Sequence, residues 1–256
     1  MADRDDDFFI GWAGPSRRSL AFLVVVSVGL IGLFAGAAAT VTQLQSSPGA
    51  SERKTSEYVG IFHTEPYPHL VVPTEDGAAT VLMSSGNKAG IQGSFLGKQD
   101  QVVKAKGFGM NRDGRRFLEL WGGLQDAELP DDQLATVQAA EWEDLGPIEL
   151  SGEIVDSKCY YGRMRPGSGK AHRACAQLCV RGGVPPVLVT HAPDGKRSHV
   201  LVVGPDRSDV HEEILDWIAE PVEVAGKLWR RGDLFAIELG TEDPGTSITR
   251  LWPEMR

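Results

Sequence analysis

The chain has 256 residues, of which 41% are hydrophobic, so it is long enough for one large or two small domains beside a targeting segment. Its formal net charge is -9 at pH 7 and no basic face is apparent, which excludes a nucleic-acid partner because phosphate binding needs positive charge. There is no G-x-S-x-G, no H-E-x-x-H and no recognisable catalytic pair of carboxylates, so a non-enzymatic role is favoured.

A hydrophobic segment near the N-terminus predicts a transmembrane helix. Leu20–Ala39 carries no charge and has the length that one helix needs to cross a hydrocarbon core of about 30 Å. We therefore expect a cytoplasmic N-terminus over residues 1–19, a helix over 20–41, and contact with the lipid bilayer through 20–39. Arg17 and Arg18 precede the helix, and the positive-inside rule then places the rest of the chain outside the cytoplasm.

The same segment has an alternative interpretation as a cleaved export signal. Ser16–Leu20 resembles part of a twin-arginine motif, and Ala35–Ala39 offers small residues for cleavage. The length of the apolar run, and acidic residues before it such as Asp5 and Asp6, favour a retained anchor. Under both interpretations the remainder of the chain is exported.

The next part of the chain predicts a polar tether over residues 42–56 and a first small β domain over 57–123. Short β-branched or apolar runs are separated by proline and glycine, as is typical of strands. A hairpin is expected over Gln101–Leu120, turning at Asn111–Gly114, because Asp-Gly between two such runs favours a tight turn. A linker over 124–147 follows, with a short helix over Pro130–Ala140.

The last part predicts a second β domain over residues 148–240, followed by a tail over 241–256. Its final hairpin, Val222–Leu239, has a sequence similar to the first hairpin, which indicates two duplicated domains. Further strands are expected over Ile148–Val155, Val187–His191 and His199–Val203, with a helix over Val210–Ala219. Five short strands with a helix before the last hairpin are typical of an OB-type barrel. The predicted fold is therefore mainly β, with an N-terminal transmembrane helix and two small OB-like β-barrel domains with short helices.

The three cysteines of the chain lie in one stretch with a histidine, in the pattern C-x12-H-x2-C-x3-C. A helix over Ala171–Val180 would place His172, Cys175 and Cys179 on one face, because residues three, four and seven apart share a face. Cys159 follows the strand before this helix. Three cysteines and one histidine form a known tetrahedral ligand set, so the stretch predicts a site for zinc or copper.

Two alternatives to a metal site remain open at this stage. A disulfide between Cys159 and Cys175 or Cys179 would staple the domain and make it a non-enzymatic binding module for a protein or saccharide partner. A reactive Cys175 or Cys179 would instead make it a thiol-redox factor. No C-x-x-C-H occurs, so covalent haem attachment is not predicted.

Other charged residues near the cysteines give weaker predictions. A glycine- and proline-containing loop carries four basic residues that are candidates for docking an acidic partner: Arg163, Arg165, Lys170 and Arg173. His63 and His69 flank a proline-rich turn as a candidate second metal pair, although surface histidines are the more common case. Asp156 and Lys158 are interpreted as solvated charges at a strand end.

The motif G-x-I-V-D-x-K-C, followed by H-x-x-C-A-x-x-C and Gly-Gly-x-Pro-Pro, resembles small exported bacterial OB-like domains of unassigned role. The overall layout is similar to the haem chaperone of cytochrome c maturation, a single-pass protein with an exported OB-like barrel. Gly240–Arg256 lacks the His/Tyr motif with which that family holds haem, so the haem role is not implied. The resemblance implies a single-pass protein of the bacterial inner membrane with periplasmic domains. Topology and cysteine cluster together suggest an accessory or assembly subunit of a membrane redox complex, with other membrane subunits as partners.

Overall fold

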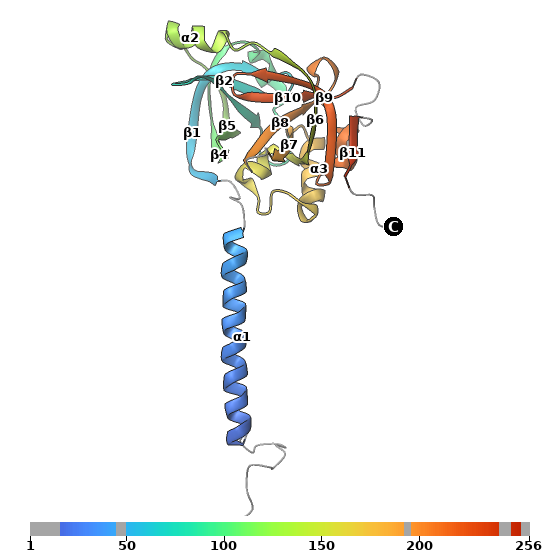
Figure 1. The fold of residues 1–256 in the computed structure, drawn as a ribbon. Helices are drawn as coiled ribbons and strands as arrows, with labels where there is room; N and C mark the ends of the chain where they lie inside the picture. The colour runs from blue at the N-terminus through green and yellow to red at the C-terminus, as the bar shows by residue number, and fades with distance from the viewer. Residues whose placement is uncertain (1–15, 45–49, 192–195, 241–246, 252–256) are drawn as a thin grey trace, which may run out of the picture. The chain divides into compact units, whose positions relative to one another are not determined.

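A computed structural model of the chain describes residues 16–44, 50–191, 196–240 and 247–251. The chain divides into two compact units, Met1–Ser47 and Pro48–Arg256. Among the described residues, those of the first unit form one helix, and those of the second contain all of the strands (Figure 1).

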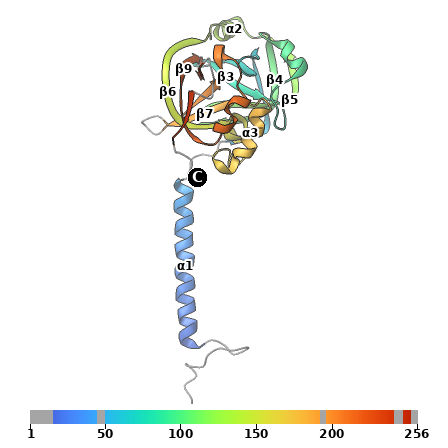
Figure 2. The ribbon, with the colours of Figure 1, turned by 90° about the vertical axis from the view of Figure 1, so that its right-hand side faces the viewer.

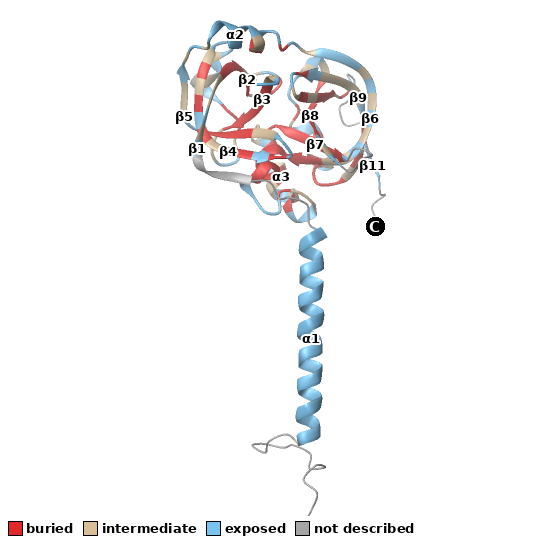
Figure 3. Ribbon diagram, turned by 60° about the vertical axis from the view of Figure 1, so that its left-hand side comes forward, coloured by how far each residue is buried: buried red, intermediate tan, exposed pale blue. Residues whose placement is uncertain are grey.

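The helix α1 spans Arg17–Leu44 and is longer at both ends than the uncharged run that predicts it. At its start, the backbone N–H of Ser19 donates to Ser16 Oγ at 3.1 Å, and near its end the hydroxyl of Thr40 donates to the carbonyl of Gly36. Its side chains are exposed along the whole length, as the pale blue ribbon of Figure 3 shows. Within the described residues, it is the one helix that is long and apolar enough to cross a membrane.

The first barrel is closed by five strands in the order β1-β2-β3-β5-β4. The strands are β1 (Ala50–His63), β2 (His69–Thr74), β3 (Gly77–Ser84), β4 (Val102–Arg112) and β5 (Arg115–Asp126), and the 3-10 helix η1 (Gly93–Lys98) lies between β3 and β4. All pairings are antiparallel except β3 with β5. The predicted hairpin is confirmed, and Asp113 and Gly114 both have positive φ, 52° and 81°, as its tight turn requires.

The second barrel repeats this strand order. Its strands are β6 (Glu143–Asp156), β7 (Pro186–His191), β8 (Arg197–Val203), β9 (Pro221–Arg231) and β10 (Leu234–Glu238), and β11 (Ile248–Arg250) adds to the edge of β9. The parallel pair is β8 with β10, the counterpart of β3 with β5, and β9 pairs with both β6 and β10. The predicted fold class, two small OB-like barrels beside an apolar helix, is confirmed.

The connections between strands differ in part from the expectations. The helix expected over Val210–Ala219 is a shorter 3-10 helix, η5 (Glu212–Trp217), after a second short one, η4 (Pro205–Arg207). The linker helix is α2 (Asp131–Gln138). β1 begins at Ala50, inside the expected tether, and β6 begins at Glu143, inside the expected linker. The first half of β6 is largely exposed, so it lacks the apolar alternation that would have marked it as a strand.

The two barrels lie side by side and share a hydrophobic core (Figures 1 and 2). Leu82, Met110 and Phe117 of the first barrel pack in one cluster with Tyr161 and Leu201 of the second. Tyr161 belongs to an insertion between β6 and β7, which contains the short helix η2 (Cys159–Arg163), the 3-10 helix η3 (Lys170–His172) and the helix α3 (Arg173–Arg181). The insertion therefore lies at the contact between the barrels, and it carries all three cysteines.

A candidate metal centre between the two barrels

The four predicted ligand residues come from three short elements of the insertion. Cys159 begins η2, His172 ends η3, and Cys175 and Cys179 lie one turn apart on α3. The expected helix is confirmed, and it is followed by Gly182 and by Gly183, which has a positive φ of 97°. The segment of η3 and α3 therefore presents His172, Cys175 and Cys179 toward the turn that carries Cys159.

The side chains of these residues converge. The ligand atoms of Cys159, His172 and Cys175 lie within 4.8 Å of one another, and so do those of Asp156, Cys159 and Cys179. Cys159 belongs to both groups and so joins them. Each group lies close enough to hold a metal ion, and together they bring Cys159, His172, Cys175 and Cys179 into the one cluster that the sequence pattern predicts.

Asp156 is a member of the cluster that the sequence interpretation missed. It is completely buried at the end of β6, so its interpretation as a solvated charge is wrong. One carboxylate oxygen lies 3.0 Å from His172 Nε2, and the other accepts the backbone N–H of Cys159 at 2.8 Å. When Nε2 donates to Asp156, Nδ1 keeps the lone pair that a metal ion needs, so Asp156 fixes the tautomer of His172.

Lys88 of the first barrel reaches the same cluster, and nothing in the sequence indicates this. Its Nζ donates to Cys175 Sγ at 2.8 Å and to Cys179 Sγ at 3.8 Å, across a separation of 87 residues from Cys175. The hydrogen bond with Cys175 raises the pKa of Lys88. A positive charge thus faces two sulfurs, as a cluster of thiolates requires.

The buried pair of sulfurs is electrostatically asymmetric. The thiol of Cys159 donates to Cys179, which raises the pKa of Cys159 and lowers that of Cys179. Lys88 and Lys158 lower the pKa of Cys179 further through their positive charges. Cys179 is therefore the sulfur of this pair that most readily becomes a thiolate.

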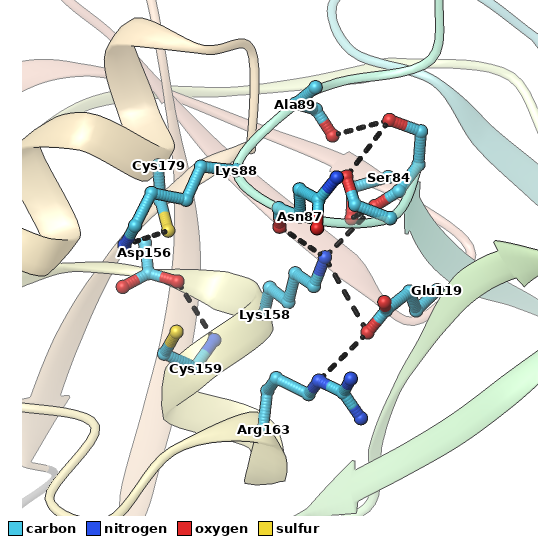
Figure 4. A network of polar contacts seen from close by, with 12 residues as sticks. Ser84, Asn87, Lys88, Ala89, Glu119, Asp156, Lys158, Cys159, Arg163 and Cys179 are labelled. Carbon is cyan, nitrogen blue, oxygen red and sulfur yellow. Dashed lines mark hydrogen bonds and ion pairs between the residues drawn. The ribbon is translucent and has the colours of Figure 1, made fainter.

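Lys158 holds the first barrel against the insertion, as Figure 4 shows. Its side chain is only 2% exposed, which corrects the expectation of a solvated charge. Its Nζ donates to the carbonyls of Ser85 and Asn87 at 2.9 and 2.7 Å, and lies 3.5 Å from Glu119 Oε2. Burial lowers the pKa of Lys158. These contacts fix the loop after β3 and thereby the position of Lys88.

A close backbone contact supports the same loop. The backbone N–H of Gly90 donates to the carbonyl of Gly182 at 2.7 Å. A Cβ atom at Gly182 would overlap the carbonyl oxygen of Lys88, so only glycine fits there without a shift of the loop.

Three of the four basic residues predicted to dock a partner lie near acidic groups of the same chain. Arg163 pairs with Glu119 at 3.1 Å, Lys170 lies 3.6 Å from Glu220, and Arg173 contacts the same carboxylate. Arg165 is exposed on the same loop. The docking role of Arg163, Arg165, Lys170 and Arg173 stays a prediction.

His63 and His69 are engaged by Arg231 of the second barrel. Arg231 donates to the Nε2 atoms of His63 and His69 at 2.7 and 3.3 Å, while His69 Nδ1 lies 2.7 Å from the carbonyl of Tyr67. The Nε2 atoms of both rings are therefore already bound to a cation, and this pair is better described as a contact between barrels than as a second metal pair.

This contact predicts a loss of stability at mildly acidic pH. Burial lowers the pKa of His69 to about 3, against about 6.5 in the unfolded chain. Below pH 6.5 the unfolded state therefore binds a proton that the folded state does not, so the free energy of unfolding falls as pH decreases toward 3, by up to about 1.4 kcal/mol per pH unit. Denaturant unfolding at pH 6.5, 5.5 and 4.5 measures this. His69→Gln should have a shallower slope, and an identical slope would contradict the assignment.

No protein-family model matches the chain, and no curated protein and no solved structure shows significant similarity to it. The geometry of the cluster between the barrels is therefore the basis for a function.

Proposed function

We propose that this chain is a membrane-anchored protein that binds one transition-metal ion through Cys159, His172, Cys175 and Cys179. The observation that carries the proposal is the convergence of three sulfurs and one imidazole at a buried point, with a carboxylate behind the imidazole. A histidine that binds a metal commonly donates its other N–H to a carboxylate, and Asp156 supplies that partner. The same contact orients the ring before a metal arrives.

The ligand types favour zinc or copper(I). Thiolates and imidazole suit both ions, and three cysteines with one histidine are a common tetrahedral set for zinc. With three thiolates and a neutral imidazole, the ion and its ligands together have a net charge of -1 for zinc and -2 for copper(I). Lys88 and Lys158 place positive charge beside the sulfurs, which offsets this excess.

The proposed setting is a membrane system. Helix α1 is long and apolar enough to serve as a retained anchor, and Arg17 and Arg18 favour a cytoplasmic N-terminus with the barrels on the other side. The proposed site consists of thiolates, and the sequence contains no recognisable catalytic motif. These two features suit an exported accessory or assembly subunit of a membrane redox complex. Other subunits of that complex would be its partners.

A second candidate function is thiol redox chemistry at Cys159 and Cys179. It is favoured by the hydrogen bond between these two thiols and by the lowered pKa of Cys179. Oxidation of the pair would form a disulfide and leave Cys175 as the remaining thiol.

Metal content and free thiols of the full chain distinguish the two functions. The chain would be exported by a host, purified in detergent without added chelator, and analysed for zinc and copper together with a thiol titration under denaturing conditions. We expect about one equivalent of metal and three free thiols, because four protein ligands hold an ion tightly enough for it to remain bound during purification. A metal-free chain with a disulfide and one free thiol would contradict metal binding, and is the result expected both of a thiol-redox factor and of a binding module stapled by a disulfide.

A further inference from the structure

The four residues of the proposed metal centre are not equally buried. The exposed fractions of Cys159, His172 and Cys179 are 3%, 5% and 1%, whereas Cys175 is half-buried. On the same helix, the neighbouring Leu178 is 50% exposed. The centre thus has a closed side formed by the shared core and a more open side at Cys175.

The open side is covered by a side chain from the first barrel. Lys88 lies on an exposed part of the loop after β3, and its Nζ contacts the sulfur of Cys175 at 2.8 Å and its carbonyl at 3.4 Å. The backbone of this loop is held by Lys158 and by Gly182, as described above. A long, flexible side chain on a fixed backbone can move away from a sulfur without disturbing the fold.

We propose that the centre transfers its metal ion, and that transfer proceeds by ligand exchange at Cys175 with an anionic thiolate carrier. This inference rests on the proposed function. The incoming thiolate binds the ion as Cys175 leaves it, and the other three ligands follow. Each departing ligand, the imidazole included, is replaced on the ion by a donor atom of the carrier, and the thiolates left in the chain take up protons or pair with Lys88. The metal keeps its oxidation state, so no electron is transferred.

Lys88 has two roles in this ligand exchange. Its positive charge attracts an anionic carrier to the open side, and after the exchange it remains paired with the thiolate of Cys175. A site whose four ligands are all buried would offer no sulfur to an incoming thiolate until the fold opens locally. The half-buried Cys175 and the exposed Lys88 beside it are the features that such a buried site would lack.

The test follows the loss of zinc from the zinc-loaded full chain in detergent. The acceptor is dimercaptosuccinate, an anionic dithiol, and dithiothreitol serves as the uncharged comparison. We expect the transfer rate to rise in proportion to the dithiol concentration. Lys88→Gln should slow transfer to dimercaptosuccinate by about tenfold at low salt, with a smaller effect for dithiothreitol, because steering by charge acts only on the anion. The matched control is Lys98→Gln, which changes a lysine of the same barrel that pairs with Asp126.

The outcomes separate this inference from the function on which it rests. If the chain binds zinc but releases it at a rate independent of dithiol concentration, the site is a closed structural one. The proposal of metal transfer at Cys175 would then be wrong. If Lys88→Gln slowed zinc transfer to both dithiols equally, the proposed role of the Lys88 charge would also be wrong. A chain that binds no zinc or copper would overturn the proposed function itself and this inference with it.

Discussion

Substitution of His172 by alanine is expected to lower the zinc affinity of the chain by more than substitution of Asp156 by asparagine. His172→Ala removes a ligand, whereas Asp156→Asn leaves all four ligands and removes only the carboxylate that fixes the imidazole. Loss of such a supporting contact commonly costs about 10- to 100-fold in metal affinity. We therefore expect the asparagine variant within that range and the alanine variant beyond it.

Competition with a chromophoric zinc chelator would measure both affinities on the full chain. His191→Ala is the matched control, because His191 is exposed at the end of β7 and is not part of the cluster. A cooperative unfolding transition of each metal-free variant in denaturant would show that the variant is folded. Unchanged affinity in a folded His172→Ala variant would exclude this histidine as a ligand and would point to the other group of candidate ligands, Asp156, Cys159 and Cys179.

Replacement of Lys158 by methionine is expected to destabilise the two-barrel unit by about 3 to 5 kcal/mol, the usual effect of removing one partner of a buried ion pair. Methionine preserves much of the side-chain length but removes the charge. The carbonyls of Ser85 and Asn87 would lose their donor, and the buried Glu119 would keep only Arg163 as a cationic partner. The loss therefore combines unsatisfied carbonyls with an undercompensated carboxylate.

Urea unfolding of the metal-free chain would measure this change. The control is Lys106→Met, which breaks an exposed ion pair with Glu57 in the same barrel and should leave the free energy of unfolding nearly unchanged. Since Lys158 also fixes the loop that carries Lys88, the variant should weaken zinc binding as well. If Lys158→Met were as stable as Lys106→Met, the loop after β3 would not depend on this lysine.

The two barrels share a strand order but differ at one connection, and that difference creates the centre. In the first barrel, β1 and β2 are joined by a short turn that contains Tyr67. The hydroxyl of Tyr67 lies within hydrogen-bonding distance of the backbone of Val210 in the second barrel. In the second barrel, the equivalent connection between β6 and β7 is the insertion with all three cysteines. The repeated strand order thus supplies the frame, and the insertion supplies the ligands.

Local patterns predicted much of this architecture. The uncharged run of Leu20–Ala39 predicted an apolar helix, and Asp113-Gly114 predicted a hairpin, because each depends on residues that are neighbours in sequence. The spacing of His172, Cys175 and Cys179 predicted one helix face for the same reason. The start of β6 was not predicted, because an exposed strand carries no apolar alternation.

The sequence by itself determined the helix, the two similar β domains and the residue types of a thiolate and imidazole site. Only the tertiary structure decided what surrounds that site. Asp156 and Lys158 look like surface charges in the sequence, yet both are buried, because the insertion of one barrel packs against the other. Lys88 reaches Cys175 from 87 residues away, since a loop of the first barrel lies over the end of α3. Spacing along a chain can bring ligands to one face, but the charges that tune them come from segments that meet only when the barrels pack together.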